Sequence, residues 1–274
     1  MKPIQNTVFG GHGFIGAHLC NYLEKGGLPY QVVGRQDPLP KGSLGNVFYC
    51  AGITADFRSR PFETMNAHIS TLSNVLEHGQ YTTFLYLSSA RMYRHASLTM
   101  EDVKFVIDPN SPEDLVDISK LAGESLCLSI DNENIRILRL SNVFGNDFFS
   151  KNFLTEIIKS ALVDRKIHLQ SGLDSSKDYV DVDSVVNVMC RIAESGASRI
   201  YNVASGYNIS HKEIVLSLRD LTGCSLTVVG DAPSIIWPII NNHRIRQEFN
   251  FKPSRLTDKL ESLVNKFETI FLKN

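Results

Sequence analysis

The sequence has no long hydrophobic run and no cluster of basic residues. Its most apolar stretch, residues 235–240, is short and contains Pro238, so we expect no membrane span, and residues 1–5 lead into a predicted strand without a signal peptide. The 28 Lys and Arg residues and the 29 Asp and Glu residues leave a formal charge of -1 at pH 7. A near-neutral chain without a basic run is not typical of proteins that bind nucleic acid or lipid. We therefore expect a cytoplasmic protein with neither partner.

Cysteine and histidine lack the patterns of a disulfide framework or a metal site. The five cysteines are odd in number and scattered, with no C-x-x-C pair, and the eight histidines include no H-E-x-x-H motif. Scattered cysteines of this kind are typical of reduced thiols in the cytosol. We expect neither disulfides nor a bound metal.

Three glycines with the spacing G-x-x-G-x-x-G join the first predicted strand to the first predicted helix. Gly10 allows the tight turn after the strand, Gly13 lets the backbone approach a pyrophosphate, and Gly16 lets the helix pack closely. The helix begins with Phe14 and Ile15, so the phosphates would meet the helix amides at the positive end of the dipole. The apolar strand before the motif and the amphipathic helix after it favour a dinucleotide-binding loop over an ordinary glycine-rich turn.

The second predicted strand, residues 31–35, ends without an acidic residue. In a dinucleotide fold an Asp or Glu at this place accepts a hydrogen bond from the ribose 2'-hydroxyl of NAD. Gly34 and Arg35 stand there instead, so a carboxylate that would repel a 2'-phosphate is missing and a guanidinium could pair with that phosphate. This favours NADP(H), and the alternative is a solvated arginine.

The connection after this strand is too short for the usual helix, strand and second helix. Residues 36–46 contain two prolines and two glycines, which is a loop composition, and the next strand covers residues 47–52. One element of the first half of the sheet should therefore be trimmed.

The rest of the chain alternates strands and helices. A buried strand over residues 83–89 ends in Ser88 and Ser89, at the edge of the sheet where ligands bind. We also expect strands over residues 135–140, 167–170 and 200–203, and helices over residues 64–78, 112–130, 153–163, 182–194, 211–221 and 256–271.

These elements predict an α/β protein with a Rossmann-like, doubly wound parallel sheet, one element of it trimmed, and a small C-terminal α/β lobe for the substrate. A chain of 274 residues is long enough for such a unit and lobe. Residues 1–145 would form the dinucleotide-binding core. Residues 146–274 would form the substrate-binding portion, interleaved with the core.

In this order the motifs resemble those of the extended short-chain dehydrogenase/reductase family, in particular its nucleotide-sugar epimerases, dehydratases and reductases. The resemblance covers nearly the whole chain. Ala51 lies in a stretch like the family's strand over the cofactor, and residues 87–93 are similar to its S-S-x-x-x-Y stretch. Other similar segments are residues 64–67, 119–124, 139–145, 177–183, 201–203 and 249–253.

The resemblance implies a Y-x-x-x-K pair. In that pair the Lys holds the nicotinamide ribose and lowers the pKa of the Tyr, and the Tyr exchanges a proton with the substrate. Lys120 matches the Lys, but Val116 stands four residues before it, and residues 95–123 contain no Tyr. Val116 and Lys120 share one helix face. We therefore expect Lys120 to keep its cofactor role, although Val116 cannot transfer a proton.

The resemblance also implies roles for residues around this pair. Ser89 matches the catalytic Ser that hydrogen-bonds the reacting oxygen. Tyr93 would face the substrate and is the first candidate for a replacement acid, with Asp117 and His95 behind it. Asn142 resembles the residue that reads the diphosphate or the sugar. The alternatives are a strand cap for Ser89, core packing for Tyr93 and an ordinary turn position for Asn142.

The implied function is an NAD(P)-dependent epimerisation, dehydration or keto reduction of a nucleotide-activated sugar, in surface polysaccharide or secondary-metabolite biosynthesis. The presence of Lys120, Ser89 and Asn142 favours this enzyme over a non-redox, cofactor-binding regulatory or structural protein on the same fold. We expect NADP as the cofactor, with NAD as the alternative, and a nucleotide sugar as the substrate. The helices over residues 64–78 and 112–130 are candidates for a homodimer interface.

Overall fold

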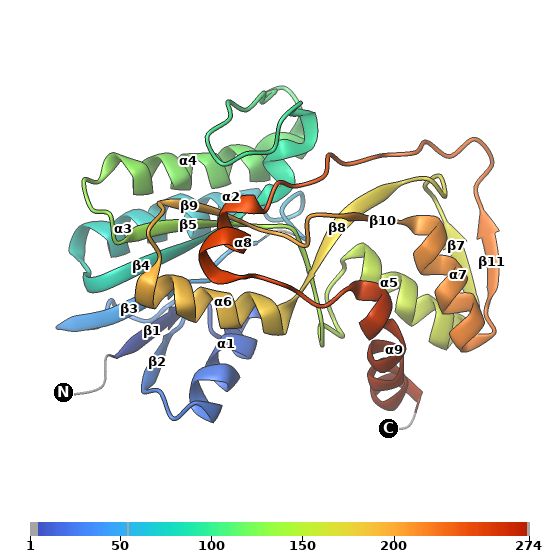
Figure 1. Ribbon diagram of the computed structural model, residues 1–274, viewed down its shortest axis with the longest axis horizontal. Coiled ribbons are helices and arrows are strands. Elements are labelled where there is room, and N and C mark those ends of the chain that lie inside the picture. Colours follow the sequence, from blue (N-terminus) through green and yellow to red (C-terminus); the bar gives the residue numbers. More distant parts are fainter. Residues whose placement is uncertain (1–4, 54, 273–274) are drawn as a thin grey trace.

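The computed structural model describes residues 5–53 and 55–272, and its core is a six-stranded sheet (Figure 1). The strand order is β2-β1-β3-β4-β5-β9, and each neighbouring pair is parallel. The carboxyl ends of all six strands therefore meet at one edge, where ligands bind in such sheets. The strands are β1 (Asn6–Phe9), β2 (Tyr30–Val33), β3 (Ser43–Tyr49), β4 (Gln80–Ser89), β5 (Ile135–Leu140) and β9 (Ile200–Val203).

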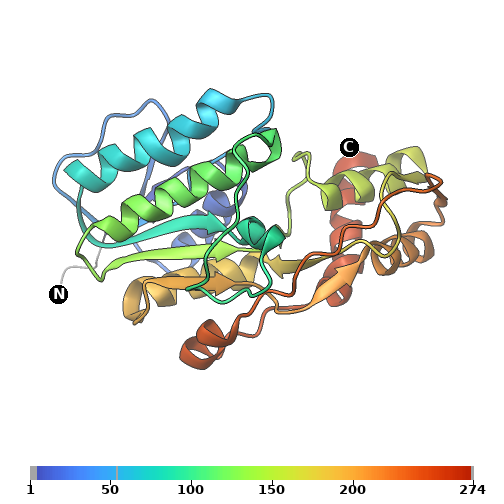
Figure 2. The same ribbon diagram turned by 90° about the horizontal axis from the view of Figure 1, so that it is seen from above.

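Helices cover both faces of this sheet (Figure 2). They are α1 (Phe14–Lys25) and α6 (Val182–Ser195) on one face, and α3 (Thr71–His78) and α4 (Leu115–Ser129) on the other. Successive side chains of β4 point to opposite faces, so Leu85 and Leu87 pack under α1 and α6, while Phe84 and Tyr86 pack under α3 and α4. This is the Rossmann-like α/β fold that the sequence predicted.

The first half of the sheet is trimmed, as predicted. β2 is an edge strand, and β3 pairs with the opposite side of β1. Residues 34–42, which connect β2 to β3, contain turns and no helix. The further strand that a complete doubly wound sheet carries beside β2 is therefore missing.

Two predicted helices differ from their expected course. The helix expected over residues 64–78 starts earlier, as α2 (Pro61–Met65), and passes through a π-helical turn at Asn66–Ser70 into α3. The helix expected over residues 112–130 begins with a 3-10 turn at Pro112–Asp114 before α4. α3 and α4 lie side by side (Figure 2). Their pairing across a homodimer stays a prediction.

Beyond β5 the chain builds a smaller lobe at the carboxyl edge of the sheet (Figure 1). Its first strand, β6 (Asn142–Phe144), follows β5 after one residue and pairs with β8 (Ser176–Asp181). This pairing places residues 142–144 with the lobe, whereas the predicted boundary placed them with the core. The other lobe elements are α5 (Phe153–Lys159), β7 (Lys166–Leu169), β10 (Asn208–Ser210), α7 (His211–Thr222), β11 (Ser225–Val228) and α9 (Leu256–Leu272).

Core and lobe are interleaved along the chain. After β8, helix α6 and strand β9 return to the core, and later α8 (His243–Phe249) packs beside β9. The lobe has a separate apolar core, formed mainly by α5, α7 and α9. In the described part of the chain, no helix combines the length and the apolar character that crossing a bilayer requires.

Candidate active site

The glycine motif forms the turn between β1 and α1 at the carboxyl edge of the sheet. Gly10 has a φ of 78°, and a Cβ there would lie 2.7 Å from the amide nitrogen of Ala51, just after β3. A Cβ at Gly16 would lie 2.2 Å from the carbonyl oxygen of Gly10, so Gly16 lets α1 pack against the turn. A side chain at either position would displace the turn.

Gly13 differs from these two glycines because it borders open space. It is exposed, and an added Cβ would meet only the carbonyl oxygen of Gly10, at 3.3 Å. Helix α1 begins directly after it, and the first helical amides, including those of Phe14 and Ile15, have no partner within a helix. The turn is therefore a cradle of backbone N–H groups at the positive end of a helix dipole, which fits a pyrophosphate.

Lys120, on α4, places a buried amine near the ends of β3 and β4. Its Nζ donates a hydrogen bond to the carbonyl oxygen of Leu87 at 2.7 Å and lies 5.0 Å from the centroid of the Tyr86 ring. A Cβ at Gly52 would lie 3.4 Å from this Nζ, so the amine borders the chain that follows β3. Burial lowers the pKa of Lys120 from 10.5 to about 8. The amine can therefore change its protonation state slightly above neutral pH.

A buried histidine connects the chain that follows β3 with helix α4, in the same region as Lys120. His68 Nδ1 lies 2.7 Å from Ser119 Oγ, and that hydroxyl donates to the carbonyl oxygen of Val116. Since the hydroxyl proton is used in this way, we assign the ring proton to Nδ1, and Nε2 accepts from the amide of Ile53 at 3.3 Å. Burial and then the charge of Lys120 lower the pKa of His68 to about 2, so the ring is neutral.

Ser89 ends β4, the strand that binds the Lys120 amine. Its Oγ accepts a hydrogen bond from the amide of Arg91 at 3.1 Å and caps the 3-10 turn Ala90–His95. The hydroxyl is half-buried and keeps a proton to donate. Leu87, which binds the amine, lies two residues earlier on the same strand. The fold therefore brings Ser89 and Lys120 to the same strand end.

Tyr93 is buried in the core, in contrast to the prediction that it faces the substrate. Its side chain is fully buried, and its hydroxyl oxygen lies 2.9 Å from Asn202 Oδ1 and accepts from Arg139 Nη1 at 2.7 Å. Burial also raises its pKa. A phenol held inside the core by these partners is not placed to deliver a proton, so Tyr93 has a structural role.

The other candidate acids are also poorly placed. Val116, at the position that matches the family's Tyr, is buried and carries no proton to transfer. His95 is exposed at the end of the 3-10 turn. Asp117 is buried, with carboxylate oxygens 3.3 Å from Arg91 and 3.5 Å from Arg94. Burial raises its pKa to about 6 although the two guanidinium groups oppose this shift, and the ion pairs occupy the carboxylate.

A match to the sequence model of a known family identifies the family. The sequence profile of the NAD dependent epimerase/dehydratase family matches residues 39–204, more than half of the chain. The chain belongs to this family. The family resemblance drawn from the motifs is thereby confirmed.

Individual proteins are also similar to this chain, one in sequence and two in fold. The chain is 29% identical over 251 residues to the GDP-6-deoxy-D-mannose reductase of Pseudomonas aeruginosa, covering 82% of each protein. Its fold is similar to TunA, an NAD-dependent NDP-hexosamine 5,6-dehydratase, with a TM-score of 0.81, 15% identity and coverage of 99% of this chain and 100% of that chain. It is also similar to RMD from Pseudomonas aeruginosa complexed with NADPH, with a TM-score of 0.75, 22% identity and coverage of 98% of each chain.

Two acidic residues stand near Arg35, at the end of β2 where the sequence predicted the contact with the adenosine ribose. Arg35 Nη1 lies 2.5 Å from Glu63 Oε2 on α2. Asp37 Oδ2 accepts from the amide of Gly34 at 2.7 Å. The prediction that no carboxylate stands at the end of β2 is therefore wrong, because the turn after β2 places the Asp37 carboxylate beside Gly34. The similar structures include both an NAD-dependent enzyme and an NADPH complex, so they do not distinguish NAD from NADP.

The lobe contributes a cation to which the sequence interpretation assigned no role. Lys177, on β8, is half-buried, with Nζ 5.1 Å from the centroid of Phe153 and 5.4 Å from that of Tyr179. Among the described residues no hydrogen-bond acceptor or carboxylate binds this amine. Burial and then the charge of Arg91 lower the pKa of Lys177 to about 8.

Asn142, the predicted substrate residue, is exposed and donates to a backbone carbonyl oxygen of β8 at 2.8 Å.

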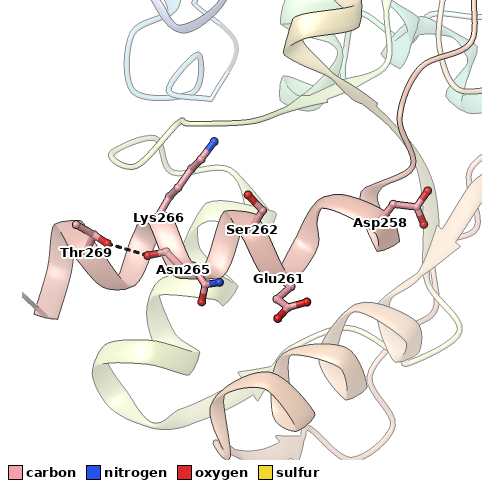
Figure 3. A pocket seen from close by; sticks show the side chains of 6 residues that line it. All are labelled: Asp258, Glu261, Ser262, Asn265, Lys266 and Thr269. Carbon is pink, nitrogen blue, oxygen red and sulfur yellow. Dashed lines mark hydrogen bonds between the residues drawn. The ribbon is translucent and has the colours of Figure 1, made fainter.

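Two surface recesses lie elsewhere. One, of about 540 Å³, lies between residues 100–102, Ser198 and α8. The other, of about 420 Å³, lies over the exposed side of α9 (Figure 3) and is lined by Asp258, Glu261, Ser262, Asn265, Lys266 and Thr269. Neither includes the glycine turn, Lys120 or Ser89. Across residues 5–53 and 55–272, no three His, Cys, Asp or Glu side chains are grouped to hold a metal ion.

Proposed function

We propose that this chain reduces the keto group of a nucleotide-activated sugar with NADPH, in surface polysaccharide or secondary-metabolite biosynthesis. The observation that carries the proposal is the convergence of Lys120, Ser89 and Gly52 at the carboxyl edge of the sheet. Gly52 follows Ala51, which packs against the glycine turn. The region around Lys120 and Ser89 therefore adjoins the proposed dinucleotide cradle. The similarity to a GDP-6-deoxy-D-mannose reductase supports a reduction over an epimerisation or a dehydration.

The residues present fit a dinucleotide cofactor. The open space at Gly13 and the first amides of α1 would receive the pyrophosphate, and Lys120 would hydrogen-bond the nicotinamide ribose. When bound, the reduced cofactor supplies the hydride. Arg35, which is exposed at the end of β2, would pair with the 2'-phosphate, and this choice rests on its guanidinium group alone.

A keto reduction also needs a proton, and we assign its delivery to Lys120. The pKa of about 8 leaves the amine protonated at neutral pH, and the amine lies beside the strand that ends in Ser89. Ser89 would donate its hydroxyl hydrogen bond to the keto oxygen as negative charge develops there. Lys120 would then release its proton to that oxygen and become neutral, which replaces the phenol that Val116 lacks.

Cationic side chains on the lobe side of the site would bind the substrate diphosphate. The Lys177 amine lacks an anionic partner among the described residues, and a phosphate oxygen would supply one. Burial and then the charge of Arg91 lower its pKa, so this lysine of the lobe lies within electrostatic reach of the segment that follows Ser89. Asn142, at the junction between core and lobe, would contact the sugar or the diphosphate.

A non-redox protein that binds a dinucleotide is the second candidate function. Val116 favours it, because a buried valine replaces the group that members with the Y-x-x-x-K pair use as the acid. This candidate keeps the cradle and the ribose contact of Lys120 but predicts no turnover.

The two candidates are separated by incubating the purified protein with NADPH and a panel of 4-keto nucleotide sugars that differ in base and sugar. We expect consumption of NADPH and a product heavier by two hydrogen atoms for at least one substrate. Dinucleotide binding without turnover of the whole panel would favour the non-redox protein. Failure to bind any dinucleotide would contradict both candidates.

A further inference from the structure

Two arginines share one carboxylate beside the end of β2. Glu63, on α2, receives a hydrogen bond from Arg35 Nη1 at 2.5 Å and one from Arg60 Nε at 3.0 Å, and Arg60 Nη2 binds the same carboxylate. The hydrogen bonds and charge of Arg60, followed by the hydrogen bond and charge of Arg35, lower the pKa of Glu63 to about 2. The carboxylate is therefore charged at any physiological pH.

The two arginines are held differently. Arg60 binds Glu63 through two nitrogens and lies three residues before it, whereas Arg35 reaches it through one nitrogen from a distant part of the chain. The Arg35 side chain is 60% exposed. Exposed ion pairs of this kind are weak and readily exchanged. Arg35 can therefore leave Glu63 while Arg60 keeps that carboxylate paired.

We propose that Glu63 is a cofactor-specificity residue that competes with the 2'-phosphate of NADP(H) for Arg35. With NAD(H) bound, Arg35 stays on Glu63. With NADP(H) bound, Arg35 exchanges the carboxylate for the phosphate, and Arg60 retains Glu63. The inference rests on the proposed function, because it requires a dinucleotide in the glycine cradle.

The neighbouring acid does not take this role. Asp37 accepts a hydrogen bond from the amide of Gly34 at 2.7 Å and so is held by the backbone at the end of β2. Its contact does not involve Arg35, whereas Glu63 binds the side chain that the phosphate would need. Glu63 therefore controls how available Arg35 is, and Asp37 contributes a constant negative charge.

Glu63→Gln tests the competition. Titration of the protein with NADPH and with NADH, followed by cofactor fluorescence at constant ionic strength, gives both dissociation constants without any turnover. We expect NADPH affinity to rise by about twofold to fivefold, the range set by an exposed ion pair, and NADH affinity to stay unchanged. Asp220→Asn is the matched control: it removes the same charge from an exposed pair, with Arg219 on α7, and should change neither constant.

Arg60→Gln tests the partner exchange. Without Arg60 the carboxylate depends on Arg35, so NADPH affinity should fall by about twofold to fivefold, and this loss should disappear in the Glu63→Gln background. A loss that persists in that background would overturn the exchange, because Arg60 would then contact the phosphate itself.

The outcomes for Glu63 and for the proposed function are distinct. If the wild type binds both cofactors and Glu63→Gln leaves their ratio unchanged, the competition is overturned and the proposed function stands. A loss of NADH affinity in Glu63→Gln would also overturn it, because the carboxylate would then bind the ribose hydroxyl. Failure of the wild type to bind either cofactor would overturn the proposed function and this inference with it.

Discussion

The Nζ atom of Lys120 lies 2.7 Å from the carbonyl oxygen of Leu87, which ties helix α4 to the strand that ends in Ser89. This contact holds the amine where the proposed reduction needs both a ribose contact and a proton. Lys120→Met should therefore lower the rate of keto reduction by about 10² to 10⁴ and weaken NADPH binding. Lys120→Arg keeps the positive charge but cannot release a proton. Compared with Lys120→Met, it should therefore recover NADPH binding more than turnover. Steady-state kinetics and cofactor titration on both variants measure this split.

The same assignment predicts a pH dependence of turnover. The pKa of Lys120 is lowered to about 8 by burial, so the ammonium form holds its proton below that pH and loses it above. The kcat of keto reduction should fall as the pH rises through about 8, and the kcat of the reverse oxidation, which needs the neutral amine, should rise. Profiles in the two directions that do not mirror each other would contradict a proton donated by Lys120.

Replacement of Val116 by Tyr should increase the rate. A phenol one helical turn before Lys120 would lie on the same helix face, and the ammonium would lower its pKa. Since a positioned general acid contributes about 10² to 10⁴ in rate, even part of this effect is measurable with a 4-keto nucleotide sugar. Val116→Phe is the control, because it adds the ring to this buried position without the hydroxyl. Equal rates for the Tyr and Phe variants would show that the phenol is not used.

The glycines of the turn should respond differently to a side chain. At Gly13 an added Cβ meets only one carbonyl oxygen, at 3.3 Å, so Gly13→Val should leave the fold intact and abolish cofactor binding by filling the pyrophosphate space. At Gly16 a Cβ would lie 2.2 Å from a carbonyl oxygen, so Gly16→Val should also lower the melting temperature. Circular dichroism and fluorescence titration separate the two effects. Wild-type cofactor affinity in a folded Gly13→Val protein would mean that the turn does not hold a dinucleotide.

The buried pair of Glu124 and Arg139 should be important for stability. Arg139 Nη2 donates to Glu124 Oε2 at 2.7 Å, both side chains are almost fully buried, and Ser88 Oγ donates to the same carboxylate. Glu124→Gln leaves the guanidinium charge uncompensated in the core and should lower the free energy of unfolding by about 3 to 5 kcal/mol. Urea unfolding measures this loss. The double variant Glu124→Met, Arg139→Met should lose less, because no buried charge then remains unpaired.

Lys177 should affect the substrate and not the cofactor. If its amine binds the diphosphate of the nucleotide sugar, Lys177→Met should raise KM for the sugar by about tenfold or more and leave NADPH affinity unchanged. Lys159→Met is the control: its amine also lies over an aromatic ring, 5.6 Å from the centroid of Phe271, but it is exposed on α5. An unchanged KM in Lys177→Met would assign this lysine to lobe packing.

The sequence alone is sufficient to predict the parallel sheet, the glycine turn, and the places of Lys120 on a helix and of Ser89 at a strand end. These features follow from short-range patterns, because strands buried on both faces are continuous apolar runs and a phosphate-binding turn needs glycines at particular spacings. The missing element between β2 and β3 was also predictable, since the connecting segment is too short for a helix and a strand. Likewise, the absence of a tyrosine four residues before Lys120, where Val116 stands, is a fact of the sequence alone.

The directions of individual side chains and the contacts between distant residues could not be predicted from the sequence. The Tyr93 hydroxyl is buried against Arg139, and Asp37 binds the backbone at the end of β2. Arg35 and Glu63, which are 28 residues apart in the sequence, form a hydrogen bond. His68 lies in the π-helical turn, near Lys120, whereas the sequence motif covers only residues 64–67. Motif spacing specifies a position along an element, whereas the direction of a side chain depends on packing against partners that are remote in sequence.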